Sequence, residues 1–119
     1  MKSLLIFTVC LAASAIDLPP STEPKNIVGT WWTKLCDRYE GRYDFRSDFT
    51  YSGSCADMID AGRWKLHKGG KLELISYSDF EKKTISNTSS RDIVLINSFS
   101  KKVMHVTLWD GKKDIWTKR

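Results

Sequence analysis

The sequence predicts an all-β fold, a single up-and-down antiparallel meander closed into an eight- to nine-stranded barrel. From residue 27 onward, short segments of alternating apolar and polar residues recur at a spacing of about ten residues, which is typical of a sandwich or barrel. The connections between them are short, and no segment has the apolar period of an amphipathic helix. Short connections favour a meander, and closure removes the edge strands that an open sheet would expose.

Residues 1–15 have the pattern of a secretory signal peptide. Met1-Lys2 is a short positive start, Leu4 to Leu11 is an apolar run interrupted only by Thr8, and Ala13-Ser14-Ala15 supplies the small residues of a cleavage site. The apolar run is far shorter than the ~20 residues that span a bilayer, so we expect no transmembrane segment. We therefore expect a secreted or periplasmic protein. A lipoprotein modified at Cys10 is the alternative.

Residues 16–26 are predicted to form a proline-rich linker. Three prolines fall between positions 19 and 24, and proline disfavours both helix interiors and central strands. An extended, mobile tether is expected here, followed by the barrel domain at residues 27–119.

Period-two alternation predicts each strand in turn. In the first strand it places Trp31, Thr33 and Leu35 on one face. Asp110-Gly111 is the strongest short hairpin signal of the chain, and a weaker strand signal covers Lys82 to Ser86. The expected strands are 30–36, 41–46, 49–54, 62–66, 72–77, 82–86, 93–99, 103–109 and 113–118.

Cys36 and Cys55 are the two cysteines that remain once the signal peptide is removed. An even pair in a small exported domain predicts a disulfide, worth on the order of 3 kcal/mol through loop closure. Metal ligation and a reactive thiol are the alternatives. The predicted register places the two residues at the same end but two strands apart, ~10 Å in a flat sheet, so loops must fold across to join them.

The chain is basic, with a formal net charge of +5. Its basic residues occur as pairs in separate turns and at the end: Lys82-Lys83, Lys101-Lys102, Lys112-Lys113 and Lys118-Arg119. Scattered pairs among acidic residues are typical of solubilising charge, and export argues against nucleic acid. An anionic envelope surface is a possible partner only if the charges cluster.

No catalytic, metal or cofactor signature is found, and we expect a protein that is not an enzyme. The two histidines, His67 and His105, lack a nucleophile turn such as Gly-x-Ser-x-Gly. Two pairs of acids, Asp57 with Asp60 and Asp79 with Glu81, fall in predicted loops as solvated charge. Asn87-Thr88-Ser89 is a glycosylation sequon in a predicted loop, which matters only in a eukaryotic secretory pathway.

Five short motifs are similar to those of bacterial lipocalin-like (calycin-type) domains. They are Ile27-Val28-Gly29-Thr30-Trp31, Tyr43-x-Phe45 with the Asp48-Phe49-Thr50 turn, Gly62-x-Trp64, Leu72-x-Leu74 and Trp116-x-Lys118. The resemblance covers nearly all of the predicted barrel domain. It implies an up-and-down barrel with Trp31 across its closed end, where Lys118 or Arg119 stacks on the indole by a cation–π contact.

The aromatic residues suggest a ligand pocket inside the barrel. The candidates are Trp31, Tyr43, Phe45, Tyr51, Trp64 and Trp109. An eight-stranded barrel is only just wide enough for side chains, so a filled core and a small pocket are both open, and Arg63 could point inward or outward. We expect a non-catalytic binding protein for a small apolar or amphipathic ligand. The alternative is a filled barrel whose outer surface recognises a protein or polyanion.

Overall fold

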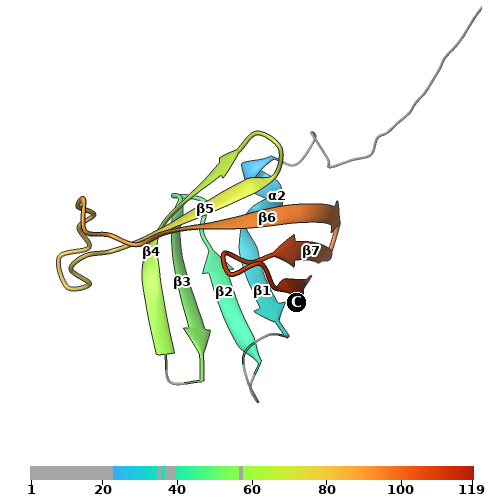
Figure 1. Cartoon of the computed structure of the whole chain (residues 1–119), viewed down its shortest axis with the longest axis horizontal. Coiled ribbons are helices and arrows are strands. Elements are labelled where there is room, and N and C mark those ends of the chain that lie inside the picture. The colour runs from blue at the N-terminus through green and yellow to red at the C-terminus, as the bar shows by residue number, and fades with distance from the viewer. Residues whose placement is uncertain (1–22, 35, 37–39, 57) are drawn as a thin grey trace, which may run out of the picture.

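The computed structural model describes residues 23–34, 36, 40–56 and 58–119, and it confirms the predicted closed antiparallel barrel. Each strand pairs with the next in sequence, and β8 pairs with β1 (Figure 1). The strands are β1 (Gly29–Thr33), β2 (Gly41–Phe45), β3 (Thr50–Cys55), β4 (Met58–His67), β5 (Lys71–Ser76), β6 (Arg91–Ser100), β7 (Val103–Thr107) and β8 (Lys113–Lys118). The predicted signal peptide, linker residues 16–22 and Leu35 lie outside the described residues.

The expectation that prolines exclude helix near residue 24 is wrong. A single helical turn, α2 (Pro24–Ile27), precedes β1 and begins with its proline. The first turn of a helix leaves its N–H groups unpaired, so a proline there loses no hydrogen bond. Within the described residues, no helix is long and apolar enough to cross a membrane.

The weak strand expected at 82–86 is also absent, so the barrel has eight strands. The register of β5 with β6 pairs Ile75 with Arg91. Residues 77–90 are thereby left without a partner strand, and only an isolated bridge between Asp79 and Thr84 forms within them. They make a long loop that extends away from the barrel (Figure 1).

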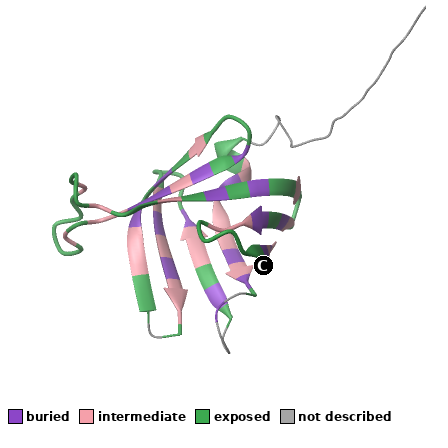
Figure 2. Cartoon of the chain, viewed as in Figure 1, coloured by how far each residue is buried: buried purple, intermediate pink, exposed green. Residues whose placement is uncertain are grey.

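Alternate residues of every strand point into the barrel, as the period-two pattern predicted. Buried and more exposed positions alternate along the strands (Figure 2). The buried cluster consists of Ile27, Trp31, Phe45, Tyr51, Trp64, Leu72, Leu74, Val94, Ile96, Met104, Val106 and Trp116. These large side chains fill the half of the barrel next to α2, which we call the closed end.

Trp31 plugs the closed end. Its side chain is fully buried, and its indole Nε1 donates a hydrogen bond to the carbonyl oxygen of Ile27 in α2 at 2.8 Å. The Lys118 ammonium lies 5.5 Å from the centre of the Trp31 ring. Arg119 stacks instead on Trp32, at 4.4 Å on the outer face.

Two glycines of the motifs allow close approaches that a side chain would block. A Cβ on Gly62 would lie 1.9 Å from the Ile75 carbonyl oxygen of the neighbouring strand. Gly29 has a φ of +135°, and a Cβ there would lie 2.5 Å from the Lys118 side chain. The Gly-x-Trp pattern therefore combines a glycine that permits a close approach, to a side chain at Gly29 and to backbone at Gly62, with a large inward-facing ring two residues later.

Cys36 and Cys55 are paired at disulfide distance, with their Cα atoms 5.5 Å apart. Cys36 follows β1 and Cys55 ends β3, so the bond spans β2 at the end of the barrel away from α2. The two cysteines are thus closer than the two-strand separation expected for a flat sheet, and the Cys36 side chain lies over Gly41 of β2.

Removing both cysteines as Cys36→Ala with Cys55→Ala is expected to lower the free energy of unfolding by about 3 kcal/mol, because the unfolded chain loses a cross-link over 19 residues. Urea denaturation measures the loss. Thiol titration of denatured, unreduced protein should detect no free thiol from this pair, and two free thiols would contradict the bond.

Adjacent tryptophans give a matched test of the plug. Trp31→Ala is expected to cost about 3–5 kcal/mol, because it empties a fully buried site. Trp32→Ala removes an outward, half-buried ring and its contact with Arg119, and should cost about 1 kcal/mol. Equal losses in urea denaturation would contradict the assignment of Trp31 as the plug.

Candidate ligand-binding cavity

A cavity of about 760 Å³ occupies the end of the barrel opposite α2. This open end is where the odd-numbered strands finish and the even-numbered strands begin (Figure 1). Small residues, Thr33, Gly41 and Gly53, face the barrel interior here. Gly53 makes room for the Tyr43 ring, which a Cβ at that position would meet at 2.6 Å. Of the aromatic side chains in the described buried cluster, Trp116 reaches the cavity, whereas Trp31, Phe45, Tyr51 and Trp64 are not in its described lining.

Two stacked aromatic rings form the floor of the cavity. The Tyr43 and Trp116 ring centres are 4.9 Å apart, with 28° between the ring planes. Phe45 lies behind both rings, 5.8 Å from Tyr43 and 6.3 Å from Trp116 between centres. Leu74 and Leu108 add apolar surface to the wall.

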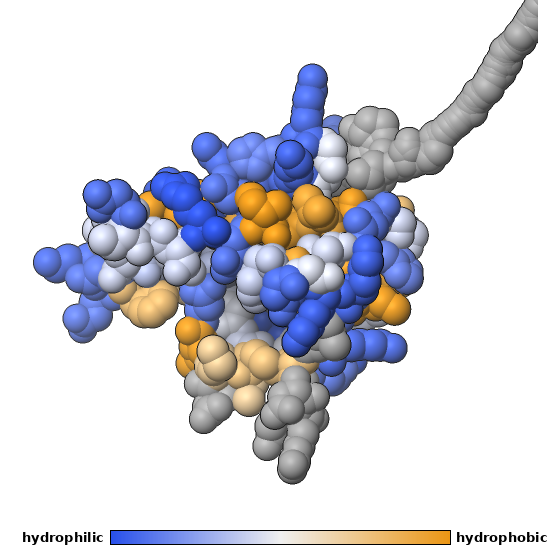
Figure 3. All heavy atoms as spheres, viewed as in Figure 1, coloured by the Kyte–Doolittle hydropathy of each residue, from blue (hydrophilic) through white to orange (hydrophobic). Residues whose placement is uncertain are grey.

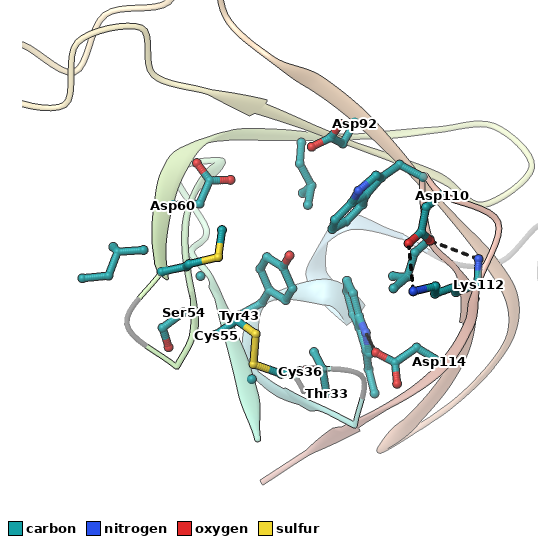
Figure 4. A pocket seen from close by; sticks show the side chains of 18 of the residues that line it. Thr33, Cys36, Tyr43, Ser54, Cys55, Asp60, Asp92, Asp110, Lys112 and Asp114 are labelled. Carbon is teal, nitrogen blue, oxygen red and sulfur yellow. Dashed lines mark hydrogen bonds and ion pairs between the residues drawn. A yellow bond between two sulfur atoms is a disulfide. The ribbon is translucent and has the colours of Figure 1, made fainter. Parts of the chain in front are cut away.

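Four aspartates and two lysines belong to the described lining of the cavity. Asp60 on β4, Asp92 on β6 and Asp114 on β8 face a common space from separate walls (Figure 4). The fourth, Asp110, lies in the β7–β8 turn and pairs with Lys112 at 3.9 Å. The interior of a basic protein therefore has an excess of negative charge at this end.

Two of these carboxylates are held in place by hydrogen bonds. Asp60 accepts from the Tyr51 hydroxyl at 2.7 Å and from the Ser76 hydroxyl at 2.8 Å. Asp114 is buried and accepts from the Trp116 indole at 3.0 Å and from the Lys34 backbone N–H at 3.1 Å. Bonds of this kind fix the orientation of a carboxylate.

Asp92 and Tyr43 present polar atoms to the cavity without a partner among the described residues. The carboxylate of Asp92 makes no hydrogen bond or ion pair with them, and burial, together with the charge of Asp60, raises its pKa. The hydroxyl of Tyr43 points toward the middle of the cavity (Figure 4). Burial, then the charge of Asp60, raises its pKa to about 12, so at neutral pH it remains a hydrogen-bond donor.

Exposed apolar side chains form the rim of the opening. Met58 and Ile59, at the start of β4, are 74% and 76% exposed, and Trp109 in the β7–β8 turn is 51% exposed. All three line the cavity. The opening therefore has an apolar edge above a wall of carboxylates.

The aromatic residues predicted to form a pocket divide between the cavity and the core. Tyr43 and Trp109 line the cavity. The other four, Trp31, Phe45, Tyr51 and Trp64, lie in the packed core, although the Tyr51 hydroxyl reaches Asp60.

Among the cavity residues that sequence reasoning missed are the inward carboxylates of Asp60, Asp92 and Asp114 and the ring of Trp116. The signal that could have found them is the same alternation that placed the core. Asp60 shares a face with Trp64, Asp92 shares one with Val94, and Asp114 shares one with Trp116, which is buried. Asp60 was expected in a loop, but it lies within β4.

The remaining candidates lie outside the cavity. His67 bonds Glu73 at 2.8 Å, and this contact lowers the pKa of the glutamate. His105 and Arg63 are exposed on strands, so their side chains face outward, and Asn87 is exposed in the long loop. No group of three or more His, Cys, Asp or Glu in the described part of the chain is arranged to hold a metal ion.

Asp92→Asn is expected to raise the free energy of unfolding at neutral pH. Folding raises the pKa of this carboxyl, so stability that is complete below the unfolded-state pKa is lost as the pH rises through the folded-state pKa. The neutral amide avoids that loss. Urea denaturation should reveal a gain at neutral pH that disappears in acid, whereas a loss at neutral pH would mean that the carboxylate makes a stabilising contact.

Comparison with known proteins leaves the function to be argued from this cavity. No family model, curated protein or solved structure matches the chain.

Proposed function

We propose that this is an exported, non-catalytic binding protein of lipocalin-like type, which holds a small amphipathic organic cation in the open end of its barrel. The observation that carries the proposal is the cavity of about 760 Å³, with an aromatic floor and carboxylates on facing walls. Ligand pockets of about 300–1,000 Å³ commonly enclose molecules of the size of a drug or a cofactor.

The aromatic floor favours a ligand with an apolar body. The Tyr43 and Trp116 rings present a flat face against which a ring or short aliphatic chain can pack. Apolar groups at the rim, including Met58 and Trp109, extend that surface toward the opening. A purely apolar ligand would leave the wall carboxylates dehydrated and unpaired, which costs free energy.

The carboxylates favour a positive charge on the same ligand. Asp92 has no partner among the described residues, and the charge of Asp60 contributes, after burial, to raising the pKa of Asp92. A cation between them forms charge-assisted hydrogen bonds and relieves that repulsion. The described carboxylates are not grouped as ligands of one metal ion, so an ammonium group on an organic body fits better.

Export is supported by two features. The first 15 residues read as a signal peptide, and the close pair of Cys36 and Cys55 is compatible with an oxidising compartment. The lipocalin-like assignment is supported by the eight-stranded meander and by Trp31 beneath Lys118 at the closed end.

The alternative is a module that acts through its outer surface on a protein or polyanion. Ile93 and Leu95 are exposed on the outer face of β6 by 37% and 40%, and hydrophobic atoms gather over this strand (Figure 3). Two half-exposed side chains fall short of the ~800 Å² that each partner buries in a standard protein interface. The cavity is therefore the better candidate.

Titration with phenethylamine tests the proposal, since this probe combines a ring with an ammonium group. Binding should change the fluorescence of tryptophan, because Trp109 and Trp116 line the cavity. Phenethylamine should bind more tightly than its neutral analogue 2-phenylethanol, and 3-phenylpropanoate should bind least. Affinity should fall as the pH falls through the raised pKa of Asp92, because the protonated carboxyl loses its charge.

The matched variants are Asp92→Asn and Glu81→Gln, each of which removes one negative charge. Asp92→Asn should weaken the amine by about tenfold or more, as expected for a hydrogen bond to a charged group. Glu81 is exposed in the β5–β6 loop and outside the cavity lining, so Glu81→Gln should change little. Equal effects of the two variants on phenethylamine affinity, or tighter binding of 3-phenylpropanoate than of phenethylamine, would contradict the assignment of a cationic ligand.

A further inference from the structure

The closed end of the barrel gathers six of the twelve described lysines, which are far apart in the sequence. In an up-and-down barrel, alternate turns lie at the same end. The β2–β3, β4–β5 and β6–β7 turns therefore surround α2 and the end of β8. Two hydrogen bonds support this proximity, from the Lys118 N–H to the Lys102 carbonyl at 2.9 Å and from the Ile96 N–H to the Gly70 carbonyl at 2.8 Å.

We call this surface the basic end and define it by the basic side chains of these segments. They are Lys25, Arg46, Lys68, Lys71, Lys101, Lys102 and Lys118. Against these seven, the described acidic residues of the same turns and helix are Glu23 and Asp48. Hydrophilic side chains cover this end beside α2 and the β4–β5 hairpin (Figure 3).

Most of the basic end is available for an external partner. Lys25 pairs with Glu23 at 3.6 Å, and Arg46 bonds the Ser52 hydroxyl at 2.8 Å. The other five lysines make no ion pair with any residue that the structure describes. Four of them are exposed, Lys68 and Lys71 at the β4–β5 hairpin and Lys101 and Lys102 in the β6–β7 turn.

We propose that the basic end binds an anionic phospholipid surface. Six of its seven cations are lysines, which act as point charges, whereas binding to individual phosphate or sulfate groups favours the forked guanidinium of arginine. The charges lie on several turns and helix α2 rather than along one groove. A linear polyanion needs a continuous track, but lipids diffuse laterally and can meet each lysine separately.

One exposed aromatic residue at the same end supports a lipid partner. Phe49 lies in the β2–β3 turn, packs on Trp64 with 4.9 Å between ring centres, and is 45% exposed. It lies next to Arg46 and Asp48 in that turn and has a φ of +67°. An exposed apolar ring at the same end of the barrel as these lysines matches the boundary between headgroups and acyl chains.

Docking by the basic end would orient the cavity away from the membrane. The basic end and the opening lie at opposite ends of the barrel, so the rim that includes Met58 and Trp109 would face solution. A bound protein could then exchange its ligand with the aqueous phase. This inference concerns a different surface from the cavity and stands without the proposed ligand.

Vesicle co-sedimentation tests the proposal with the full chain. The protein should bind vesicles of equal parts phosphatidylglycerol and phosphatidylcholine but not vesicles of phosphatidylcholine alone, and added salt should weaken binding. The variant Lys101→Gln with Lys102→Gln should lose about thirtyfold in partition coefficient, from about fivefold for each lysine near the surface. Lys82→Gln with Lys83→Gln removes the same charge from the β5–β6 loop and should retain nearly full binding.

All variants have the same amino-terminal segment, so any contribution of that segment to vesicle binding is equal in each. A difference between the two lysine-pair variants therefore reports the contribution of the basic end. Equal losses of vesicle binding in the two double variants would overturn the proposal, because binding would then depend on net charge and not on the position of the lysines. Loss of vesicle binding in the variant Met58→Ser with Ile59→Ser would also overturn it, because the apolar rim of the cavity would then be the surface that contacts the membrane. Binding to soluble heparin without binding to vesicles would overturn it in favour of a polyanion. Urea denaturation confirms that each variant is folded.

Discussion

The narrow interior of an eight-stranded barrel is the constraint on which the rest of this structure depends. Such a barrel is only just wide enough to be filled by side chains, so the size of each inward residue decides whether space remains. At the closed end the inward residues are large, and Trp31 anchored to Ile27 plugs the barrel. At the open end they include Gly41 and Gly53. A gradient of side-chain volume along the axis, rather than a wider barrel, therefore creates the cavity.

The same topology separates the charges of the molecule. Turns that are far apart in sequence meet at the closed end, where basic residues outnumber acidic ones. The interior of the open end instead presents Asp60, Asp92 and Asp114. The lysines of the closed end and the inward carboxylates of the cavity therefore lie at opposite ends of the barrel. Four aspartates against two lysines in the described lining favour a cation in the cavity. A formal net charge of +5 conceals this polarity.

The cysteine count and the expected export predicted the cysteine pair, and alternation with turn chemistry predicted the meander and the alternating faces of its strands. The same alternation could have identified a cavity carboxylate, because Asp60, Gly62 and Trp64 are alternate residues on the same face of β4. The number of strands depended on pairing, since residues 82–86 alternate weakly but have no partner beyond the bridge at Thr84. The placement of Lys68 and Lys102 at the same end of the barrel likewise follows from the strand topology, which local patterns do not encode.

The inward carboxylates are hard to explain as devices for stability. Asp92 has a raised pKa and no partner among the described residues, and partly buried charges of like sign weaken a fold. Apolar side chains at these positions would extend the core that already includes Leu74 and Trp116. Natural sequences tend to break the rules of core packing at functional sites and to compensate elsewhere. Here the disulfide and the filled closed end supply the compensation, which leaves the open end free to hold charges that a ligand can neutralise.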